Sequence, residues 1–311
     1  MTNLESQATE NLTHHDDDDI DDDDDQLNSQ HKIVPLASEI NKQDSWKKTT
    51  NQSNFDAANL IKTDIKKYVS TTIPEDHSGF IHCHIKREKE GRTKAFSTIY
   101  YLYFDGQTTD DQSLLLIARK HFAVGGHSEY FIGYNVDNPS KNLNEENSIA
   151  KLKRTTNIGH EYVLYDHQKT GKPQLAAMLY EKHLIGKGHP RRLDVLLHDT
   201  EKTTRQLKDN ETIIDEWAAG HSNDLMQLRN KIPVFNEETK SHHLTFVESR
   251  VIQPSHKNFQ LVMLTTNNAE HIVMEFGRID ANNFALDYRY PLRATEAFAI
   301  ALSCFHNRFT T

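Results

Sequence analysis

The stretch Ala294-Thr-Glu-Ala-Phe-Ala-Ile-Ala-Leu-Ser-Cys-Phe305 consists mainly of good helix formers and carries no charge after Glu296. A helix that is apolar on every face has to be buried on every face. In a single domain made of strands, the place that can surround a helix is the inside of a barrel. A helix lying on a β-sandwich would instead show a polar stripe, and this stretch has none. The sequence therefore predicts a central helix at about 294–306.

The region before this helix has the rhythm of a β domain. Short runs rich in β-branched and aromatic residues alternate with polar turns, and no long helix interrupts them. So many strands must either form a sandwich or close on themselves. The period of two does not choose between these, but the apolar helix favours a closed barrel, so the predicted class is mainly β (α+β). The expected strands are Phe80–Lys86, Thr98–Phe104, Ser113–Arg119, Tyr130–Tyr134, Tyr162–Tyr165, Leu175–Tyr180, Leu193–Leu197, Leu244–Val247, Phe259–Leu264, His271–Phe276 and Asn283–Tyr288.

The beginning of the chain is acidic. Residues 1–60 hold 14 Asp and Glu against 4 Lys and Arg, so that the remaining 31 acids and 32 bases leave the rest at +1. The run Asp16 to Asp25 is broken only by Ile20, and it repels itself too strongly to collapse around a few apolar residues. We predict a disordered acidic tail over residues 1–55. It is either a solvated spacer or an acidic arm that binds a partner or competes for a cationic site.

The segment 56–69 has apolar residues near helical spacing, with Asn54 or Asp56 available as a cap. It predicts one short amphipathic helix, either packed on the edge of the following domain or serving as a docking peptide for a protein partner.

The rest of the composition indicates an intracellular, non-enzymatic protein. Cys83 and Cys304 cannot form a disulfide framework, and no N-terminal apolar stretch resembles a signal peptide. His82 and His84 alternate along one expected strand, but further zinc ligands at the usual spacing are missing. No nucleophile elbow, phosphate-cradling Gly-rich loop or His-Glu-x-x-His occurs. We therefore expect no catalytic residues, cofactor or metal site.

Several multi-residue motifs carry a family resemblance, and they recur in order with no long gap among them. They are Asn230-Lys-Ile-Pro-Val-Phe-Asn-Glu-Glu-Thr239, Lys257-Asn-Phe-Gln260, Ile272-Val-Met-Glu-Phe-Gly-Arg278 and Asp287-Tyr-Arg-Tyr-Pro-Leu292. Together with the apolar helix, they resemble the C-terminal domain of the tubby family, here at about 65–311. The resemblance implies a twelve-stranded antiparallel barrel around a buried helix. It also implies binding of phosphatidylinositol bisphosphate at the inner face of the plasma membrane, movement of membrane proteins into cilia with the intraflagellar transport machinery, and transcriptional regulation after release from the membrane.

The resemblance also suggests a site for the head group. An inositol bisphosphate needs several converging cations, and arginine offers paired donors to each phosphate. Arg119 and Lys120 stand where the family has a run of Arg and Lys, and Lys151, Lys153 and Arg154 stand where it has Lys-Leu-Arg. Alternation along a strand puts Lys151 and Lys153 on one face. The basic run itself is shorter here, because it continues as His121-Phe-Ala-Val-Gly-Gly126, whose Phe122 and Val124 could instead insert into the bilayer interface.

A second function remains open at this point. The same cations could meet a nucleic-acid backbone, as in a transcription regulator. A balance of only +1 outside the tail gives little of the broad electrostatic footprint that duplex binding needs. Membrane adaptor is therefore the leading interpretation, and nucleic acid is an unlikely partner.

Overall fold

The structure is a computed structural model, and it describes residues 32–37, 54–89, 98–106, 112–122, 128–134, 137–155, 161–181, 192–198, 212–220, 225–264 and 269–305. The strands are β1 (Ile33–Ala37), β2 (Ile81–Lys89), β3 (Thr98–Asp105), β4 (Gln112–Phe122), β5 (Ser128–Gly133), β6 (Ala150–Arg154), β7 (Glu161–Asp166), β8 (Gln174–Tyr180), β9 (Leu193–His198), β10 (Leu225–Asn230), β11 (Val234–Asn236), β12 (Ser241–Phe246), β13 (Phe259–Leu264), β14 (Glu270–Arg278) and β15 (Asn283–Tyr288). The helices are α1 (Ala57–Thr63), α2 (Ile65–Ser70), α3 (Pro139–Asn142), α4 (Ile213–Ala218) and α5 (Ala294–Cys304).

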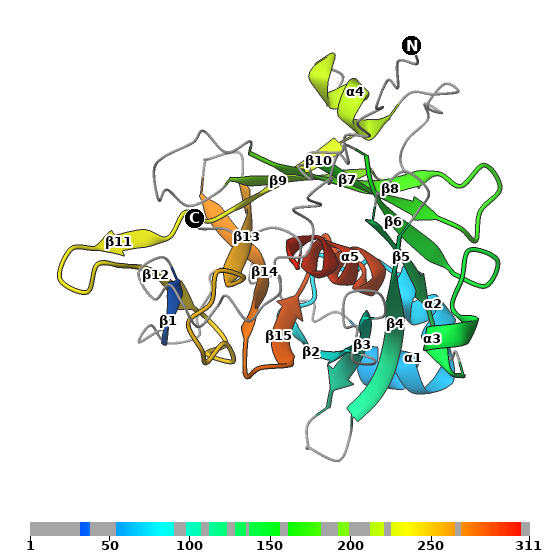
Figure 1. Cartoon of the computed structure of the whole chain (residues 1–311), viewed down its shortest axis with the longest axis horizontal. Helices are drawn as coiled ribbons and strands as arrows, with labels where there is room; N and C mark the ends of the chain where they lie inside the picture. Colours follow the sequence, from blue (N-terminus) through cyan, green and yellow to red (C-terminus); the bar gives the residue numbers. More distant parts are fainter. Residues whose placement is uncertain are drawn as a thin grey trace, which may run out of the picture.

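Twelve strands form a closed barrel with the order β10-β13-β14-β15-β2-β3-β4-β5-β6-β7-β8-β9 (Figure 1). Every neighbouring pair is antiparallel, and the ring closes where β10 lies between β9 and β13. The early strand β2 pairs with the late strand β15, with Ile81 opposite Tyr288 and Lys86 opposite Asn283. Closure leaves no open sheet edge in the barrel. The predicted closed twelve-stranded architecture is confirmed.

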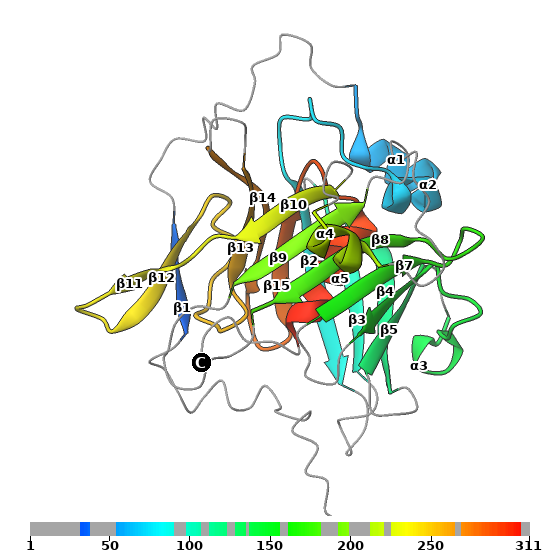
Figure 2. The ribbon, with the colours of Figure 1, turned by 90° about the horizontal axis from the view of Figure 1, so that it is seen from above.

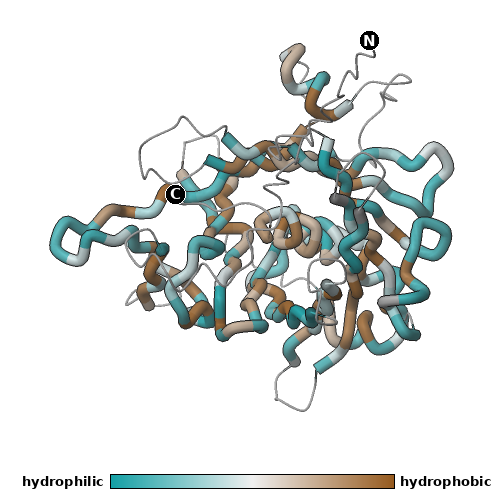
Figure 3. The backbone as a smooth tube through the Cα atoms, in the orientation of Figure 1, coloured by the Kyte–Doolittle hydropathy of each residue, from teal (hydrophilic) through white to brown (hydrophobic). Residues whose placement is uncertain are grey.

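Helix α5 runs through the middle of the barrel (Figure 1), and the hydropathy colouring shows this central coil toward the hydrophobic end of the scale (Figure 3). Every residue from Ala294 to Cys304 is buried, as the apolar sequence predicts. The one charged residue inside it, Glu296, accepts the backbone N–H of Arg293 at 3.0 Å and so caps the first turn. Near the other end, the Tyr180 hydroxyl and the Ser303 hydroxyl are 2.8 Å apart.

A second, three-stranded sheet lies outside the barrel, with the order β1-β12-β11 (Figure 2). Its edge strand β1 corrects the expectation that residues 1–55 are disordered, because Ile33–Ala37 pairs in parallel with β12 and Ile33 is only 1% exposed. The apolar run Ile33-Val-Pro-Leu-Ala37 is short and surrounded by polar sequence, so its composition alone did not mark it as a strand. Of the remaining tail, residues 1–31 and 38–53 lie outside the described residues.

The single helix expected at 56–69 is two short helices. Asp64 ends α1, and its side chain also caps α2 by accepting the N–H of Lys67 at 2.9 Å, so the chain turns at this residue. The two helices pack on the barrel domain, which was one of the two interpretations of this segment. The Tyr68 and Tyr288 hydroxyls are 2.8 Å apart, and Thr295 donates to the Val69 carbonyl at 2.8 Å. No helix in the described part of the chain has the length and apolarity to cross a bilayer.

Most of the predicted strands are where they were expected, and the barrel itself differs from the prediction in three strands. The run Leu244–Val247 was expected among the strands of the closed domain, but it belongs to β12 in the outer sheet. The barrel instead includes β6 and β10, which are absent from the list of expected strands, although the alternation of Lys151 and Lys153 already treated the first of them as extended. Both are short and carry charged or amide side chains, which weakens the local signal for a strand.

Candidate functional site

The outer face of strands β4, β5 and β6 carries two rows of side chains that cross the sheet. In the first row, Arg119 lies opposite Phe131, and Phe131 lies opposite Lys151. In the second row, His121 lies opposite Glu129, which lies opposite Lys153. Adjacent strands are about 4.8 Å apart, so the Cα atoms of Arg119 and Lys151 are about 10 Å apart. We call Arg119, Lys151 and Lys153 the outer cation patch.

The five cations predicted from the sequence do not all share this face. Lys120 lies opposite Tyr130 and Arg154 lies opposite Tyr162, and both tyrosines belong to the hydrophobic cluster inside the barrel. Because side chains alternate between the faces of a strand, Lys120 and Arg154 point to the inner side, and Arg154 is buried. A single cluster of all five is therefore wrong. The prediction that Lys151 and Lys153 share a face holds, and the register makes Lys153 rather than Arg154 the partner of Lys151.

Lys151 is already engaged within the patch. Its Nζ lies 2.9 Å from a carboxylate oxygen of Glu129 and 3.9 Å from one of Glu145, and it sits 5.2 Å from the centre of the Phe131 ring. Glu145 also accepts a hydrogen bond from Lys172 at 3.1 Å. That hydrogen bond, followed by the charge of Lys151, lowers the pKa of the Glu145 carboxyl below its usual range. Lys151 is thus a clamped cation rather than a free one.

Arg119 and Lys153 differ from Lys151 in this respect. Arg119 is half-buried, and its Nε is covered without a hydrogen-bond partner among the described residues. Lys153 is exposed, and no ion pair involves it in the described ranges. A covered donor that lacks an acceptor loses its hydration without compensation. The patch therefore offers unsatisfied donors to an incoming anion.

The patch rests on an apolar support on the outside of the barrel. Ile99, Ile117, Phe131 and Leu143 form a hydrophobic cluster separate from the barrel core. Leu143 follows α3 and is fully buried in this cluster, so it anchors the beginning of the segment between α3 and β6. The backbone positions of Arg119 and Lys151 thus lie beside a packed apolar cluster.

Sequence reasoning missed the acidic residues of the site. Glu129 stands in the middle of the second row and is 7% exposed, yet nothing in its local sequence marks it as a partner of Lys151. The signal that could have found it is the register of β5 against β6, which needs the pairing of strands distant in the chain. Of the segment His121 to Gly126, in which the basic run is shorter than the resemblance leads one to expect, residues 123–126 lie outside the described residues.

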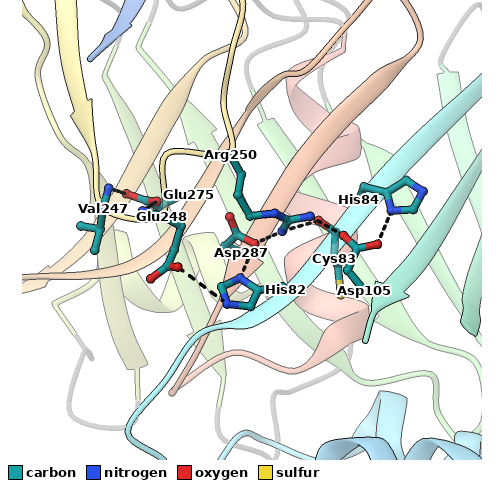
Figure 4. Close-up of polar contacts among 9 residues, drawn as sticks. All are labelled: His82, Cys83, His84, Asp105, Val247, Glu248, Arg250, Glu275 and Asp287. Atoms are coloured by element: carbon teal, nitrogen blue, oxygen red, sulfur yellow. Dashed lines mark hydrogen bonds and ion pairs between the residues drawn. The ribbon is translucent and has the colours of Figure 1, made fainter. Parts of the chain in front are cut away.

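A second polar cluster surrounds Arg250 on the outside of the barrel (Figure 4). The Arg250 guanidinium donates to Asp287 and to Asp105, and also to the Cys83 carbonyl at 3.1 Å. His82 lies 3.0 Å from Asp287, and His84 lies 2.6 Å from Asp105. The hydrogen bond to Asp287 raises the pKa of His82 above its usual value. These residues fasten the segment after β12 to strands β2, β3 and β15.

The Arg250 cluster explains the two histidines that the sequence presents as a possible start of a zinc site. Each ring is turned to a carboxylate that also accepts from Arg250, so the pair completes an ion-pair network (Figure 4). Across the ranges that the structure describes, no three His, Cys, Asp or Glu side chains group closely enough to hold a metal ion. Beside this network, Glu275 accepts the backbone N–H groups of Val247 at 2.8 Å and Glu248 at 3.0 Å.

Comparison with known proteins agrees with the fold. Residues 69–307 match the Tub family. The chain is 31% identical to Tubby protein homolog 1 of Caenorhabditis briggsae over 270 residues, which cover 80% of this chain and 62% of that protein. It is 31% identical to Protein king tubby 2 of Culex quinquefasciatus (81% of this chain, 60% of that protein) and 29% identical to human Tubby-related protein 3 (79% and 57%). The chain thus spans less than two thirds of these relatives' own lengths.

Proposed function

Because this chain belongs to the Tub family, we propose that its outer cation patch binds the phosphorylated head group of a phosphoinositide and that the protein is a membrane adaptor rather than an enzyme. The observation that supports this most directly is the covered Nε of Arg119, which has no acceptor among the described residues. A phosphate oxygen at this position would satisfy it with a charge-assisted hydrogen bond.

The charge of the patch suits a compact polyanion. Three cations face two carboxylates, Glu129 and Glu145, and Lys172 adds a further positive charge beside Glu145. Arg119 and Lys153 are available at once, whereas Lys151 has to exchange Glu129 for a phosphate. A head group with phosphates on neighbouring ring positions can contact two cations whose Cα atoms are about 10 Å apart.

The wider role in this proposal rests on the family resemblance. We place the protein in the cytoplasm and peripherally at the inner plasma membrane, with a membrane-protein cargo or the intraflagellar transport complex as its protein partner. The proposed destinations also include the cilium and the nucleus, and nucleic acid is not the main ligand in this proposal.

Vesicle co-sedimentation of the full chain tests the proposal. Vesicles containing phosphatidylinositol bisphosphate are compared with phosphatidylserine vesicles of equal total charge. Arg119→Ala and Lys153→Ala should each weaken binding to the bisphosphate vesicles about ten- to hundredfold, because one charge-assisted hydrogen bond contributes about 1.5 to 3 kcal/mol. Lys66→Ala removes an exposed cation of α2 and serves as the matched control, with binding unchanged.

Two outcomes would contradict the proposal. Equal binding to the two vesicle types would mean that only surface charge is read, and unchanged binding by both patch variants would place the head group elsewhere. Lys120→Ala distinguishes the faces of β4, since its inward direction predicts little loss of binding. Duplex DNA titrated in the same buffers, with a steep fall of affinity as salt rises, would favour the nucleic-acid interpretation instead.

A further inference from the structure

The outer sheet of β1, β12 and β11 has one side toward the barrel domain and one side away from it. Leu244 and Phe246 of β12 are buried in the main hydrophobic cluster. His243 and Thr245 alternate with them along the strand, so their side chains point away from the barrel. Figures 1 and 2 show this sheet at one side of the molecule, outside the closed barrel. One side of the sheet therefore faces outward.

Strand pairing aligns the side chains of this outward side in two rows. In the first row, Val34 of β1 lies opposite His243, and His243 lies opposite Val234 of β11. In the second row, Leu36 of β1 lies opposite Thr245. The two margins of the sheet are thus apolar on this side, whereas its middle strand is polar and uncharged.

Ile232 completes the second row on the β11 side. It stands two residues before Val234, and the following Pro233 favours extended backbone for it, so the two side chains share a face. Leu36 is 41% exposed, Ile232 48% and Val234 73%. Exposed apolar side chains that gather on one face indicate a contact surface. We call this surface the outward face, and its residues are Val34, Leu36, Ile232, Val234, His243 and Thr245.

From this pattern we propose that the outward face is a contact between two copies of this chain, packed sheet on sheet about a two-fold axis that runs along β12. A two-fold contact requires a surface that is complementary to itself. The rotation lays β1 of one copy over β11 of the other and keeps each row at its own height. Val34 then faces Val234 of the second copy, and Leu36 faces Ile232 of the second copy. Apolar margins meet apolar margins, and the polar strand meets itself.

The charges at the rim fit the same rotation. Lys32 stands two residues before Val34 and therefore points to the same side of the sheet. The turn after β11 carries Glu237 and the exposed Glu238, and Glu237 pairs with Lys240 at 2.7 Å. The rotation brings Lys32 of each copy toward this acidic turn of the other copy. Two opposite-charge contacts related by the axis set the orientation of the copies.

The size of the outward face limits the strength of the contact. The Cα atoms of β1 and β11 are about 10 Å apart, and the two rows are about 7 Å apart. A standard interface buries about 800 Å² on each partner, which is more than this face offers. We therefore expect a weak dimer with a dissociation constant on the order of 100 µM. The face lies across the barrel from the outer cation patch, so both patches of a dimer stay uncovered, and the inference does not rest on lipid binding.

Sedimentation velocity of the full chain at about 5 to 500 µM measures the association. The sedimentation coefficient of the wild type should rise with concentration toward that of a dimer. Val234→Asp puts two carboxylates into each contact and should keep the chain monomeric over the whole range. Leu264→Asp is the matched control, because Leu264 is also 48% exposed but belongs to barrel strand β13, and it should associate like the wild type. Circular dichroism checks that each variant is folded.

Lys32→Glu and Glu238→Lys test the orientation of the two copies. Each variant alone places like charges at both rim contacts, so each should associate about three- to tenfold more weakly than the wild type at low salt. In an equimolar mixture of the two variants, both rim contacts again join opposite charges. The mixture should therefore regain the affinity of the wild type, which a nonspecific apolar contact would not do.

A wild-type chain that stays monomeric up to about 500 µM would overturn the proposal. Undiminished association of folded Val234→Asp, loss of association in Leu264→Asp, or a mixture no stronger than the separate charge variants would do the same. Species larger than a dimer would also reject it, because a two-fold contact closes at two copies. If Val234→Asp fails to fold, the charge variants decide, since both changes lie at the polar rim.

Discussion

Arg250 offers the sharpest test of what fixes the outer segment to the barrel. Arg250→Met keeps much of the length and the apolar part of the side chain but removes the guanidinium that donates to Asp287 and Asp105. The Asp287 side chain is 1% exposed and the Asp105 side chain 18%, so both carboxylates lose a cation in a region poor in water.

The expected loss of stability depends on the charged groups that remain around Asp287 and Asp105. Removing one partner of a buried ion pair typically costs about 3 to 5 kcal/mol. Here the Arg250 side chain is 26% exposed, and the two carboxylates keep His82 and His84 as neighbours. We therefore expect the lower end, a loss of about 3 kcal/mol in the free energy of unfolding. For a domain of this size, that corresponds to a fall of about 6 to 12 °C in the melting temperature.

Urea unfolding followed by circular dichroism measures this loss, with Arg229→Met as the matched control. Arg229 pairs with Asp194 at 2.9 Å, but its side chain is 45% exposed, so its removal should cost less than about 1 kcal/mol. Arg250→Met within about 0.5 kcal/mol of the wild type, or no more destabilised than Arg229→Met, would refute the idea that this cluster holds the segment in place.

Three further changes test other parts of the structure. Ile300→Asp puts an unpaired charge into the fully buried α5 and should prevent folding, so a soluble variant with an unchanged melting curve would contradict the central helix. His82→Ala removes a histidine whose pKa is raised in the fold by the hydrogen bond to Asp287. The stabilisation that protonated His82 gives is fully present below pH about 6.5 and is lost as the pH rises through the raised pKa. The difference in unfolding free energy between wild type and variant should therefore narrow with rising pH. A gap that widens with pH would reject this assignment. Gly277→Ala would bring a Cβ within 2.4 Å of Val251 and should cost about 1 to 3 kcal/mol by chemical denaturation, whereas Gly79→Ala meets nothing within 4 Å and should be nearly neutral.

The fold was largely predictable because its decisive signal is local. The stretch from Ala294 to Phe305 is apolar on every face of a helix, so its own sequence predicts burial on all sides. Each strand run likewise shows strand-like composition within its own few residues. Which sheet a strand joins is not local. Leu244–Val247 has the same pattern as a barrel strand, yet its neighbours in space are β1 and β11, which lie far away along the chain or have little strand signal.

The site was predicted only in part for the same reason. Alternation along a single strand correctly paired Lys151 with Lys153. It also separates Arg119 from Lys120, which the family resemblance placed in one cluster. Glu129 enters the patch through strand pairing alone, and its contact with Lys151 is set by a register that no short motif encodes.

The acidic tail shows how one missed strand changes a hypothesis. A flexible tail of about forty residues would let Asp16 to Asp25 reach any face of the barrel. With β1 docked, only residues 26–32 separate Asp25 from Ile33, and they span at most about 25 Å when fully extended. β1 lies across the barrel from the outer cation patch. The acidic run can therefore compete with a ligand for that patch only through the Asp16 end of the run, or after β1 has undocked.

The order of the elements along the chain has a consequence for how the protein is made. Helix α5 comes after all twelve barrel strands, and the pairing of β2 with β15 joins segments about two hundred residues apart. During translation, the barrel strands therefore leave the ribosome before α5, the helix that fills the barrel. The first barrel strand, β2, also leaves long before β15, with which it pairs. Contacts of such long range form slowly, and unpaired strands that wait for them are prone to aggregate. Newly synthesised chains should thus depend on chaperones until α5 emerges, and a stop codon ahead of it would leave twelve strands with nothing to close around.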